Sequence, residues 1–517
     1  MFSSELWRWL RVLGPIAIVL PVILACPTRP VETPLARGSK QTPGVYPQTI
    51  EKDVDILFLI DNSDSMGDEQ EALKANFPRL IDALRSAKLG NKLPNVHIGV
   101  ITSDLGAGNY GLPTCEVPGG DKGKLQNKAR LAGCTPPKDP YIESIEGTTN
   151  IPGATGDAVQ AVKDAFACVA SFGTGGCGFE HQLEAVRRAL DPKLNLNPGF
   201  VRKDALLAVV FVTDEDDCSA KNPQLFDPSQ QGLTDPLGPL NSFRCFEFGI
   251  QCDINDRMKV GPRQNCVPAK DYLYKVEDYV SFFKTLKPAG RLIMTAIAGP
   301  TDRVEVGRDG TEPSLRPSCQ VSKTAIASPA IRLKAVLEKD AGLKADSLFY
   351  SICEQDFGPA MLALGKKIVG KLGGQCISSP LLTPGGGLAC SAGSAVGKNS
   401  AGKDVTCAKS CLDKVECAVE EVIGQGTPTE KSTQVNKCPK EFFDDPNKAD
   451  CGANCPCWRV VPRPGTDGCS AAEDGSPYGL QIMRKGEPVK GTVAVARCLT
   501  SENKWLSKEL ADMPQCL

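Results

Sequence analysis

The chain has 517 residues, and its 59 lysines and arginines are almost balanced by 61 aspartates and glutamates. This near-neutral charge removes the electrostatic basis for binding nucleic acid or for holding a membrane through a polybasic surface, so we expect no nucleic-acid partner. Only two histidines, His97 and His181, are present, which is too few for a multi-histidine metal centre or for most histidine-based hydrolases, and we expect both to be structural.

The N-terminal 25 residues are typical of an export signal. Arg8 and Arg11 precede an apolar run over residues 13–25. These 13 residues are fewer than the roughly 20 that a membrane-spanning helix needs. Residues 1–25 are therefore predicted to be a cleaved signal peptide.

The signal ends in Ile23-Leu24-Ala25-Cys26, which resembles the bacterial lipobox. The resemblance implies a lipid on Cys26, and Pro27, where inner-membrane lipoproteins carry an aspartate, implies the outer membrane. An ordinary signal peptide with an incidental cysteine is the alternative. With Cys26 assigned to lipid, 22 of the 23 cysteines remain, an even number that suits disulfides in an oxidising compartment. We therefore expect a lipid-anchored protein of the cell envelope.

The rest of the chain divides by composition into three parts. Residues 26–50 are rich in Pro, Thr, Gly and Arg and have no apolar period, which predicts a lipidated, disordered tether. Residues 51–375 alternate apolar runs of strand length with amphipathic helices, and residues 376–517 are dense in cysteine, which predicts a small disulfide-rich domain. In that last part Cys451, Cys455 and Cys457 form a cluster for which we expect disulfides, with zinc as the alternative.

The alternation over residues 51–375 predicts an α/β fold, a doubly wound and mainly parallel sheet flanked by helices. The strands are predicted at 54–60, 96–102, 205–213, 292–298 and 348–353, and the helices at 73–84, 159–169, 179–190, 271–286, 330–339 and 357–372. Pro78 is expected to kink or split the first helix. Two long insertions, at about 106–153 and 217–270, contain cysteines and are predicted to be stapled by disulfides near the ligand-binding edge of the sheet.

The sequence Asp61-Asn62-Ser63-Asp64-Ser65 directly follows the first predicted strand. A tight turn there presents alternate side chains to one side, so that one carboxylate and two hydroxyls converge at the carboxyl edge of the sheet. This D-x-S-x-S pattern resembles the metal-ion-dependent adhesion site of von Willebrand factor type A (vWA) domains, as found in integrins and matrix proteins. Such oxygen ligands favour Mg²⁺, or Mn²⁺ or Ca²⁺, over zinc. Helix capping by Asp61 and Ser63 is the alternative interpretation.

The resemblance implies two further ligands, an aspartate and a threonine. The aspartate is Asp214, at the end of the central predicted strand. The candidate threonine is Thr174, but the usual threonine stands closer to its helix, where this chain has Cys177 and Gly178, and Glu180 is the substitute. In vWA domains a carboxylate of the partner fills the remaining position on the ion.

A secondary acidic site formed by Asp68, Glu69, Asp216 and Asp217 is a further candidate. For the first two we prefer the interpretation that they are partners of the helix dipole, and for the last two that they lie in a solvated loop. Asp104, which ends another predicted strand, is expected behind the metal ligands.

These features predict a non-enzymatic protein that binds a carboxylate-bearing protein or peptide through a divalent metal, in adhesion or envelope assembly. One alternative is a metal-independent scaffold that makes its contacts through the cysteine-containing insertions. A metal-assisted hydrolase is the third, and the sequence lacks the H-E-x-x-H and G-x-S-x-G motifs that would support it.

Overall fold

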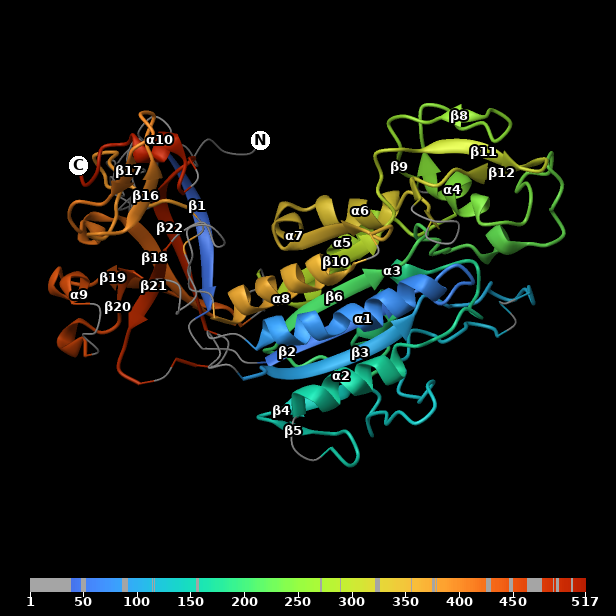
Figure 1. Cartoon of the computed structure of the whole chain (residues 1–517), viewed down its shortest axis with the longest axis horizontal. Helices are drawn as coiled ribbons and strands as arrows, with labels where there is room; N and C mark the ends of the chain where they lie inside the picture. The colour runs from blue at the N-terminus through green and yellow to red at the C-terminus, as the bar shows by residue number, and fades with distance from the viewer. Residues whose placement is uncertain are drawn as a thin grey trace, which may run out of the picture.

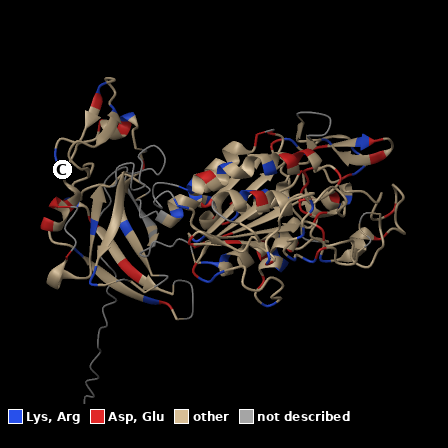
Figure 2. Cartoon of the chain, turned by 60° about the horizontal axis from the view of Figure 1, so that its bottom comes forward, with Lys and Arg blue, Asp and Glu red and all other residues tan. Residues whose placement is uncertain are grey.

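The computed structural model describes residues 39–47, 53–85, 92–113, 115, 117–154, 158–269, 272–288, 290–320, 326–354, 356–373, 377, 379–424, 429–445, 450–462, 477–486, 488–489, 492–503 and 505–517. They form an α/β body and a C-terminal body, each with a hydrophobic core of its own (Figure 1). Basic and acidic side chains are interspersed over both bodies (Figure 2). The predicted signal peptide and Cys26 lie outside the described residues. None of the described helices is both long and apolar enough to span a membrane.

The α/β body is built on a seven-stranded sheet in the order β15-β10-β6-β2-β3-β4-β5. The first five strands of this order are parallel to one another, and the two short strands at the β4–β5 edge are antiparallel. The five parallel strands are those that the sequence predicted, and the doubly wound fold class is confirmed. The strand bounds are β2 (Asp53–Ile60), β3 (Asn95–Thr102), β4 (Ile142–Ile145), β5 (Thr148–Thr149), β6 (Leu206–Val212), β10 (Leu292–Ala298) and β15 (Ser347–Ser351).

Helices cover both faces of this sheet, which explains why its parallel strands are largely apolar. Phe58 of β2 packs on one face against Phe77 and Phe166, while its neighbours Leu57 and Leu59 belong to the core on the other face. On the first face lie α1 (Gly67–Leu84), α2 (Ala158–Val169) and α8 (Gly358–Gly373). On the second lie α3 (Gln182–Leu190), α5 (Val276–Leu286), α6 (Ile331–Glu338) and α7 (Ala341–Ala345). Of the two outcomes expected at Pro78, a split of the first helix is wrong, because α1 runs through this residue without interruption.

The insertions are stapled as predicted. Cys115 and Cys134 of the first bond to Cys177 and Cys168, and the second contains the disulfides Cys218–Cys245 and Cys252–Cys266. Sequence analysis missed a third insertion, between β10 and α6, whose hairpin pairs with the second in a three-stranded sheet of order β12-β11-β8. The elements of the second and third insertions are η2 (Pro223–Phe226), α4 (Phe243–Gly249), β7 (Ile250–Gln251), β8 (Gly261–Pro262), β9 (Val267–Pro268), β11 (Glu305–Asp309), β12 (Glu312–Leu315), β13 (Cys319–Gln320) and β14 (Ile326–Ala327).

The C-terminal body is a six-stranded sheet in the order β1-β22-β18-β19-β20-β21, with short helices and a small hairpin around it. The sheet strands are β1 (Ser39–Pro47), β18 (Cys417–Ile423), β19 (Lys431–Lys437), β20 (Cys457–Pro462), β21 (Tyr478–Met483) and β22 (Val493–Ser501). Around them lie β16 (Ala395–Lys398), β17 (Asp404–Thr406), η3 (Leu412–Lys414), α9 (Glu441–Asp444), η4 (Gly452–Asn454) and α10 (Lys508–Ala511).

Strand β1 corrects the prediction that residues 26–50 form a disordered tether. Residues 39–47 pair antiparallel with β22 from Ser39–Ser501 to Pro47–Val493, and Tyr46 is buried in the C-terminal core. Because β1 is an edge strand with one neighbour, prolines are tolerated in it, and their presence hid the strand from sequence analysis. Residues 26–38 lie outside the described residues.

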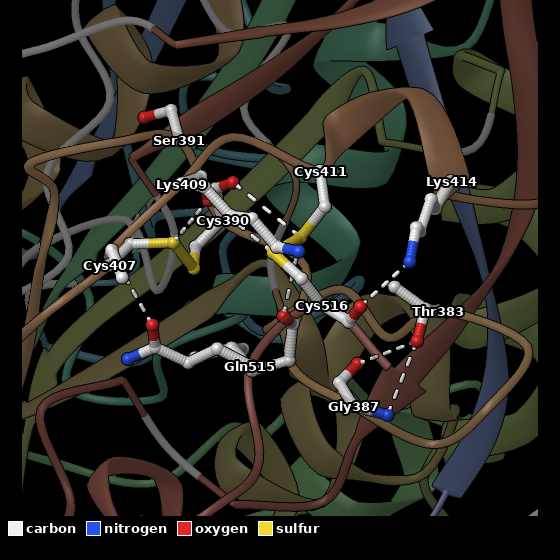
Figure 3. The surroundings of a disulfide bond; sticks show 12 residues. Thr383, Gly387, Cys390, Ser391, Cys407, Lys409, Cys411, Lys414, Gln515 and Cys516 are labelled. Atoms are coloured by element: carbon white, nitrogen blue, oxygen red, sulfur yellow. Dashed lines mark hydrogen bonds between the residues drawn. A yellow bond between two sulfur atoms is a disulfide. The ribbon is translucent and has the colours of Figure 1, made fainter.

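All twenty cysteines in the described part of the chain form disulfides, as expected for an oxidising compartment. The expected disulfides at the cysteine cluster are confirmed as Cys451–Cys455 and Cys438–Cys457. Elsewhere Cys390–Cys407 and Cys411–Cys516 lie against each other (Figure 3), with three of their sulfur atoms within 4.8 Å. Because these sulfurs are oxidised to disulfides, they are not thiolate ligands, and we assign no metal to them.

Candidate metal centre

The carboxyl ends of three neighbouring strands meet at one edge of the seven-stranded sheet. Ile60, the last residue of β2, pairs with Thr102 of β3 on one side and with Val212 of β6 on the other. The residues that follow these strand ends therefore emerge side by side. They are Asp61, Ser103 and Thr213, and Asp214 comes next after Thr213.

Asp61 is fully buried, and both of its carboxylate oxygens accept hydrogen bonds. Oδ1 accepts from the backbone N–H of Ser63 at 2.9 Å and from the hydroxyl of Ser103 at 3.1 Å, and Oδ2 accepts from the hydroxyl of Thr213 at 2.6 Å. Burial raises the pKa of Asp61, and these hydrogen bonds act against that rise. The carboxylate is thus held in a fixed orientation at the end of β2.

The two serines of the motif lie beside each other, with 3.4 Å between Ser63 Oγ and Ser65 Oγ. Ser63 is buried and Ser65 is exposed, so this pair leads from the buried Asp61 toward the surface. The helix-capping alternative is wrong, because the N-cap residue of α1 is Met66, whose side chain makes no capping hydrogen bond. The motif residues are therefore available for another role.

Asp214 has the most informative environment at this edge. Its side chain is only 3% exposed, and its Oδ1 has no hydrogen-bond partner among the residues that the structure describes. Burial, followed by the charges of Asp61 and Glu215, raises the pKa of Asp214 well above its usual value. A hydrogen bond with the Ser65 hydroxyl acts against that rise. A buried carboxylate oxygen without a partner is costly, and a bound cation would remove that cost. The donor set here, carboxylates together with serine hydroxyls, fits a hard divalent cation.

The loop that carries Thr174 is tied to the D-x-S-x-S loop. The amide of Gln70 donates to the carbonyls of Asp61 at 3.0 Å and Gly173 at 2.9 Å, and accepts from the N–H of Gly173 at 3.1 Å. The N–H of Gly176 donates to the carbonyl of Asn62 at 2.8 Å. The structure thus brings the Thr174 segment against the D-x-S-x-S motif. Cys177 and Gly178 occupy the positions closer to the helix, where the usual threonine of the resemblance stands.

Sequence analysis missed Gln70, which makes these bonds. The signal that could have found it is a polar residue on the buried face of α1, at helical spacing from Leu73 and Phe77.

Glu180, the suggested substitute ligand, lies among the same charges. It is 2% exposed, and its Oε2 has no partner among the described residues. Burial, and then the charges of Glu215, Asp61 and Asp214, raise the pKa of Glu180 well above its usual value. Burial and the charge of Asp61 raise the pKa of Glu215 to about 7. Burial and mutual repulsion therefore disfavour the ionised form of these carboxyl groups, and a bound cation would favour it.

The expectation of a solvated loop at residues 216 and 217 is wrong. Asp217 is buried, accepts from the N–H of Leu183 at 2.9 Å and pairs with the guanidinium of Arg332 at 3.1 Å. Asp216 accepts from the backbone N–H of Arg332 at 2.9 Å and 3.0 Å, at the start of α6. Both carboxylates accept hydrogen bonds from backbone N–H groups at the start of a helix, Asp217 from α3 and Asp216 from α6. The sequence could not predict these bonds, because the helices lie far from both residues in the chain.

The proposed secondary acidic site is not assembled. Asp68 and Glu69 lie in the first turn of α1, as the helix-dipole interpretation expects, and Glu69 is buried there. Within the described residues, the disulfide sulfurs of the C-terminal body are the one group of three His, Cys, Asp or Glu whose ligand atoms lie within 4.8 Å of one another. A cation at this edge would therefore depend on two carboxylates and on hydroxyls, which is the donor set of the D-x-S-x-S hypothesis.

The remaining candidates have structural roles. The ring nitrogens of His97 lie 2.9 Å from the carbonyl oxygen of Phe200 and 3.0 Å from the carboxylate of Glu143, and His181 Nε2 lies 3.0 Å from the carbonyl oxygen of Gly106. Asp104 accepts from the N–H of Gly106 at 2.7 Å and so holds the loop after β3. The structural interpretation of both histidines is confirmed.

A cavity of about 350 Å³ opens beside the motif. Ser65, Asp214, Glu215 and Asp216 form part of its wall, and the remaining lining comes from the second and third insertions. The carboxylate of Asp214, whose Oδ1 has no partner among the described residues, therefore adjoins a hollow large enough to admit part of another molecule.

No protein-family model matches the sequence, and no curated protein matches it either. Among solved structures, the pilus adhesin SpaC from Lactobacillus rhamnosus GG, in its open conformation, is 11% identical with a TM-score of 0.29, over 91% of this chain and 42% of that one. A von Willebrand factor type A structure from Catenulispora acidiphila is 10% identical with a TM-score of 0.26, over 90% and 66% of the two chains. The pilus adhesin RrgA from Streptococcus pneumoniae is 8% identical with a TM-score of 0.26, over 91% and 59%. The chain thus spans less than half of the length of SpaC.

Proposed function

We propose that the chain binds one divalent cation at the carboxyl edge of the seven-stranded sheet and uses it to capture a carboxylate of a protein or peptide partner. The observation that carries the proposal is Asp214, which is buried beside Ser65 and Asp61 with one oxygen that has no partner among the described residues. A cation would satisfy that oxygen and offset the repulsion between the two aspartates.

The ligands would be Asp61, Ser63, Ser65 and Asp214, with Thr174 as the fifth. The hydroxyls and carboxylates favour Mg²⁺, with Mn²⁺ and Ca²⁺ as the other candidates. A bound ion supplies positive charge that its own ligands neutralise incompletely, and this charge attracts the partner's carboxylate. The role of the chain's residues is to hold the donors in place, as Ser103 and Thr213 do for Asp61.

We further propose that this capture serves adhesion or assembly at the cell envelope, with the protein held at the outer membrane by a lipid on Cys26. Mass spectrometry of membrane-extracted protein tests the lipid directly. A mature N-terminus at Cys26 with the mass of an acylated residue supports it, and an unmodified Cys26 contradicts it.

Metal binding is tested by titrating the EDTA-treated protein with Mn²⁺ and measuring free Mn²⁺ by electron paramagnetic resonance. We expect one site in the wild type and at least a tenfold weaker site in Ser65→Ala, which removes an exposed hydroxyl and leaves the core unchanged. Asp64→Asn is the matched control, because Asp64 is exposed in the same loop but outside the proposed ligand set. Equal binding by the wild type and Ser65→Ala would contradict the proposal.

Partner capture is tested by a pull-down from envelope extract with immobilised protein, in Mg²⁺ and in EDTA. We expect a partner that is retained in Mg²⁺ and lost both in EDTA and with Ser65→Ala. Retention under all three conditions would favour the metal-independent scaffold. Hydrolysis of a generic ester, phosphate or peptide substrate that Ser65→Ala abolishes would instead favour the hydrolase.

A further inference from the structure

We propose that the cavity beside Asp214 is a groove for a peptide segment of a partner in which one acidic residue stands next to an apolar side chain and to a lysine or arginine. The inference rests on the proposed function, because the acidic residue is the one that would reach the cation. It goes further in assigning selectivity to the second and third insertions, which form most of the cavity wall.

The walls of the cavity are held in place by bonds within the chain. The N–H of Ser328, after β14, donates to the carbonyl of Asp214 at 2.8 Å, and the amide of Asn241 donates to Glu312 of the hairpin at 3.0 Å. The disulfide Cys218–Cys245 fastens α4 to the segment that follows Asp214. A cavity that is already formed loses little conformational freedom on binding, which favours recognition of a defined sequence.

The inner lining of the cavity is largely apolar. Phe243 and Phe246 of α4 face this hollow together with Leu315 of β12 and Ile326 of β14. Phe243 is buried, whereas the other three are half-buried and so offer accessible apolar surface. A cavity of about 350 Å³ accommodates one large side chain and its backbone better than a whole domain. Placing an apolar side chain there would increase the affinity about tenfold or more.

The rim of the cavity is acidic. Asp309 and Glu312 stand at the two ends of the β11–β12 turn, and both are exposed. Glu215 and Asp216, which also line the cavity, are half-buried. No lysine, arginine or histidine is among the described residues of the lining. A basic side chain beside the captured carboxylate would therefore be favoured, and a second acidic one disfavoured, by a factor of about two to five for each exposed pair.

The test uses labelled, end-blocked pentapeptides and fluorescence anisotropy in Mg²⁺. The probes are Gly-Lys-Asp-Phe-Gly, its Asn analogue without the carboxylate, its Gly analogue without the aromatic ring, and Gly-Glu-Asp-Phe-Gly with a second acid. We expect Gly-Lys-Asp-Phe-Gly to bind best, at least tenfold better than the first two analogues and several-fold better than the last.

The decisive variant is Glu312→Lys on the exposed hairpin, and the matched control is Glu502→Lys, an exposed charge change in the C-terminal body. We expect Glu312→Lys to reverse the preference between the lysine and glutamate peptides, and Glu502→Lys to leave it unchanged. If Mn²⁺ binds as proposed but Glu312→Lys does not alter the preference, the groove is refuted and the metal site stands. If the wild type binds no Mn²⁺, the proposed function itself fails.

Discussion

Replacing Asp214 by Asn gives a test in which the sign of the effect, and not only its size, is predicted. In the metal-free protein, Asp214 is a buried carboxylate repelled by Asp61 and Glu215. Asparagine keeps the shape and removes the charge, so we expect the metal-free variant to be more stable than the metal-free wild type. A buried polar atom left without a partner costs about 1–3 kcal/mol, and the gain from removing the charge should be of that order.

Magnesium should reverse this order of stability. A ligand that binds only the folded state stabilises it by about 2.7 kcal/mol at one hundred times its dissociation constant. The wild type should gain about that amount in saturating Mg²⁺, whereas Asp214→Asn, which lacks a charged ligand, should gain little. The two proteins should therefore exchange rank between EDTA and Mg²⁺.

The assay is urea unfolding followed by circular dichroism at pH 7.5, in EDTA and in Mg²⁺. Asp217→Asn is the matched control, since Asp217 is equally buried but is paired with Arg332 and bonded to Leu183 and Ser219. Its loss leaves a buried guanidinium without its partner and should cost about 3–5 kcal/mol in both solutions, with the response to Mg²⁺ retained. If Asp214→Asn destabilises the metal-free protein as Asp217→Asn does, Asp214 is structural and the reasoning is refuted.

Three further outcomes follow from other parts of the structure. Burial lowers the pKa of Lys287 from 10.5 to about 8, so the folded state binds fewer protons than the unfolded state between these two pH values. The free energy of unfolding of the wild type, relative to that of Lys287→Met, should therefore rise by about 3 kcal/mol from below pH 8 to pH 10.5. A difference that stays constant with pH in urea titrations would contradict this. Phe166 is fully buried, stacks on Phe77 at 3.6 Å and meets Phe58 at 5.0 Å, so Phe166→Ala should cost about 3–5 kcal/mol in urea unfolding without affecting Mn²⁺ binding. A chain that starts at residue 48 loses β1, and calorimetry should show a lower transition for the C-terminal body only, compared with a chain that starts at residue 39; equal transitions in both would show that β1 contributes no stability.

The parallel sheet could be predicted from the sequence because a strand that is buried on both faces appears as a nearly continuous run of apolar residues. The strand at Leu292–Ala298 has the bounds that the sequence predicted, and the other four predicted parallel strands differ by a residue or two at their ends. The short elements outside this sheet do not contain such apolar runs. The β11–β12 hairpin and α4 are held by a neighbouring insertion and a disulfide rather than by a periodic apolar face, so sequence analysis did not find them.

At the candidate site, the strand-end residues could be predicted and their neighbours could not. Asp61 and Asp214 each follow an apolar strand, and parallel strands bring their carboxyl ends to one edge. Ser103 and Thr213 orient Asp61, but a serine or threonine after a strand is too common to single out. Apart from Ser219, which bonds to Asp217, the described partners of Asp216 and Asp217 given above lie on α3 and α6, up to 117 residues away, and local sequence carries no information about them.

The topology also changes how the two bodies must be understood. Because β1 pairs with β22, Ser39 opposite Ser501, the C-terminal sheet is complete only with a strand that precedes the α/β body in the chain. The α/β body is therefore inserted into the C-terminal one, rather than placed between a loose tether and a separate tail. The chain between the N-terminus and Asp61 passes through β1, and nine residue pairs hold β1 against β22. A force applied to the N-terminus would therefore act on this pairing before it reaches Asp61. The contacts between β1 and β22 join residues far apart in the sequence, and such contacts form late in folding. The C-terminal sheet can therefore be completed only after β22 is available to pair with β1.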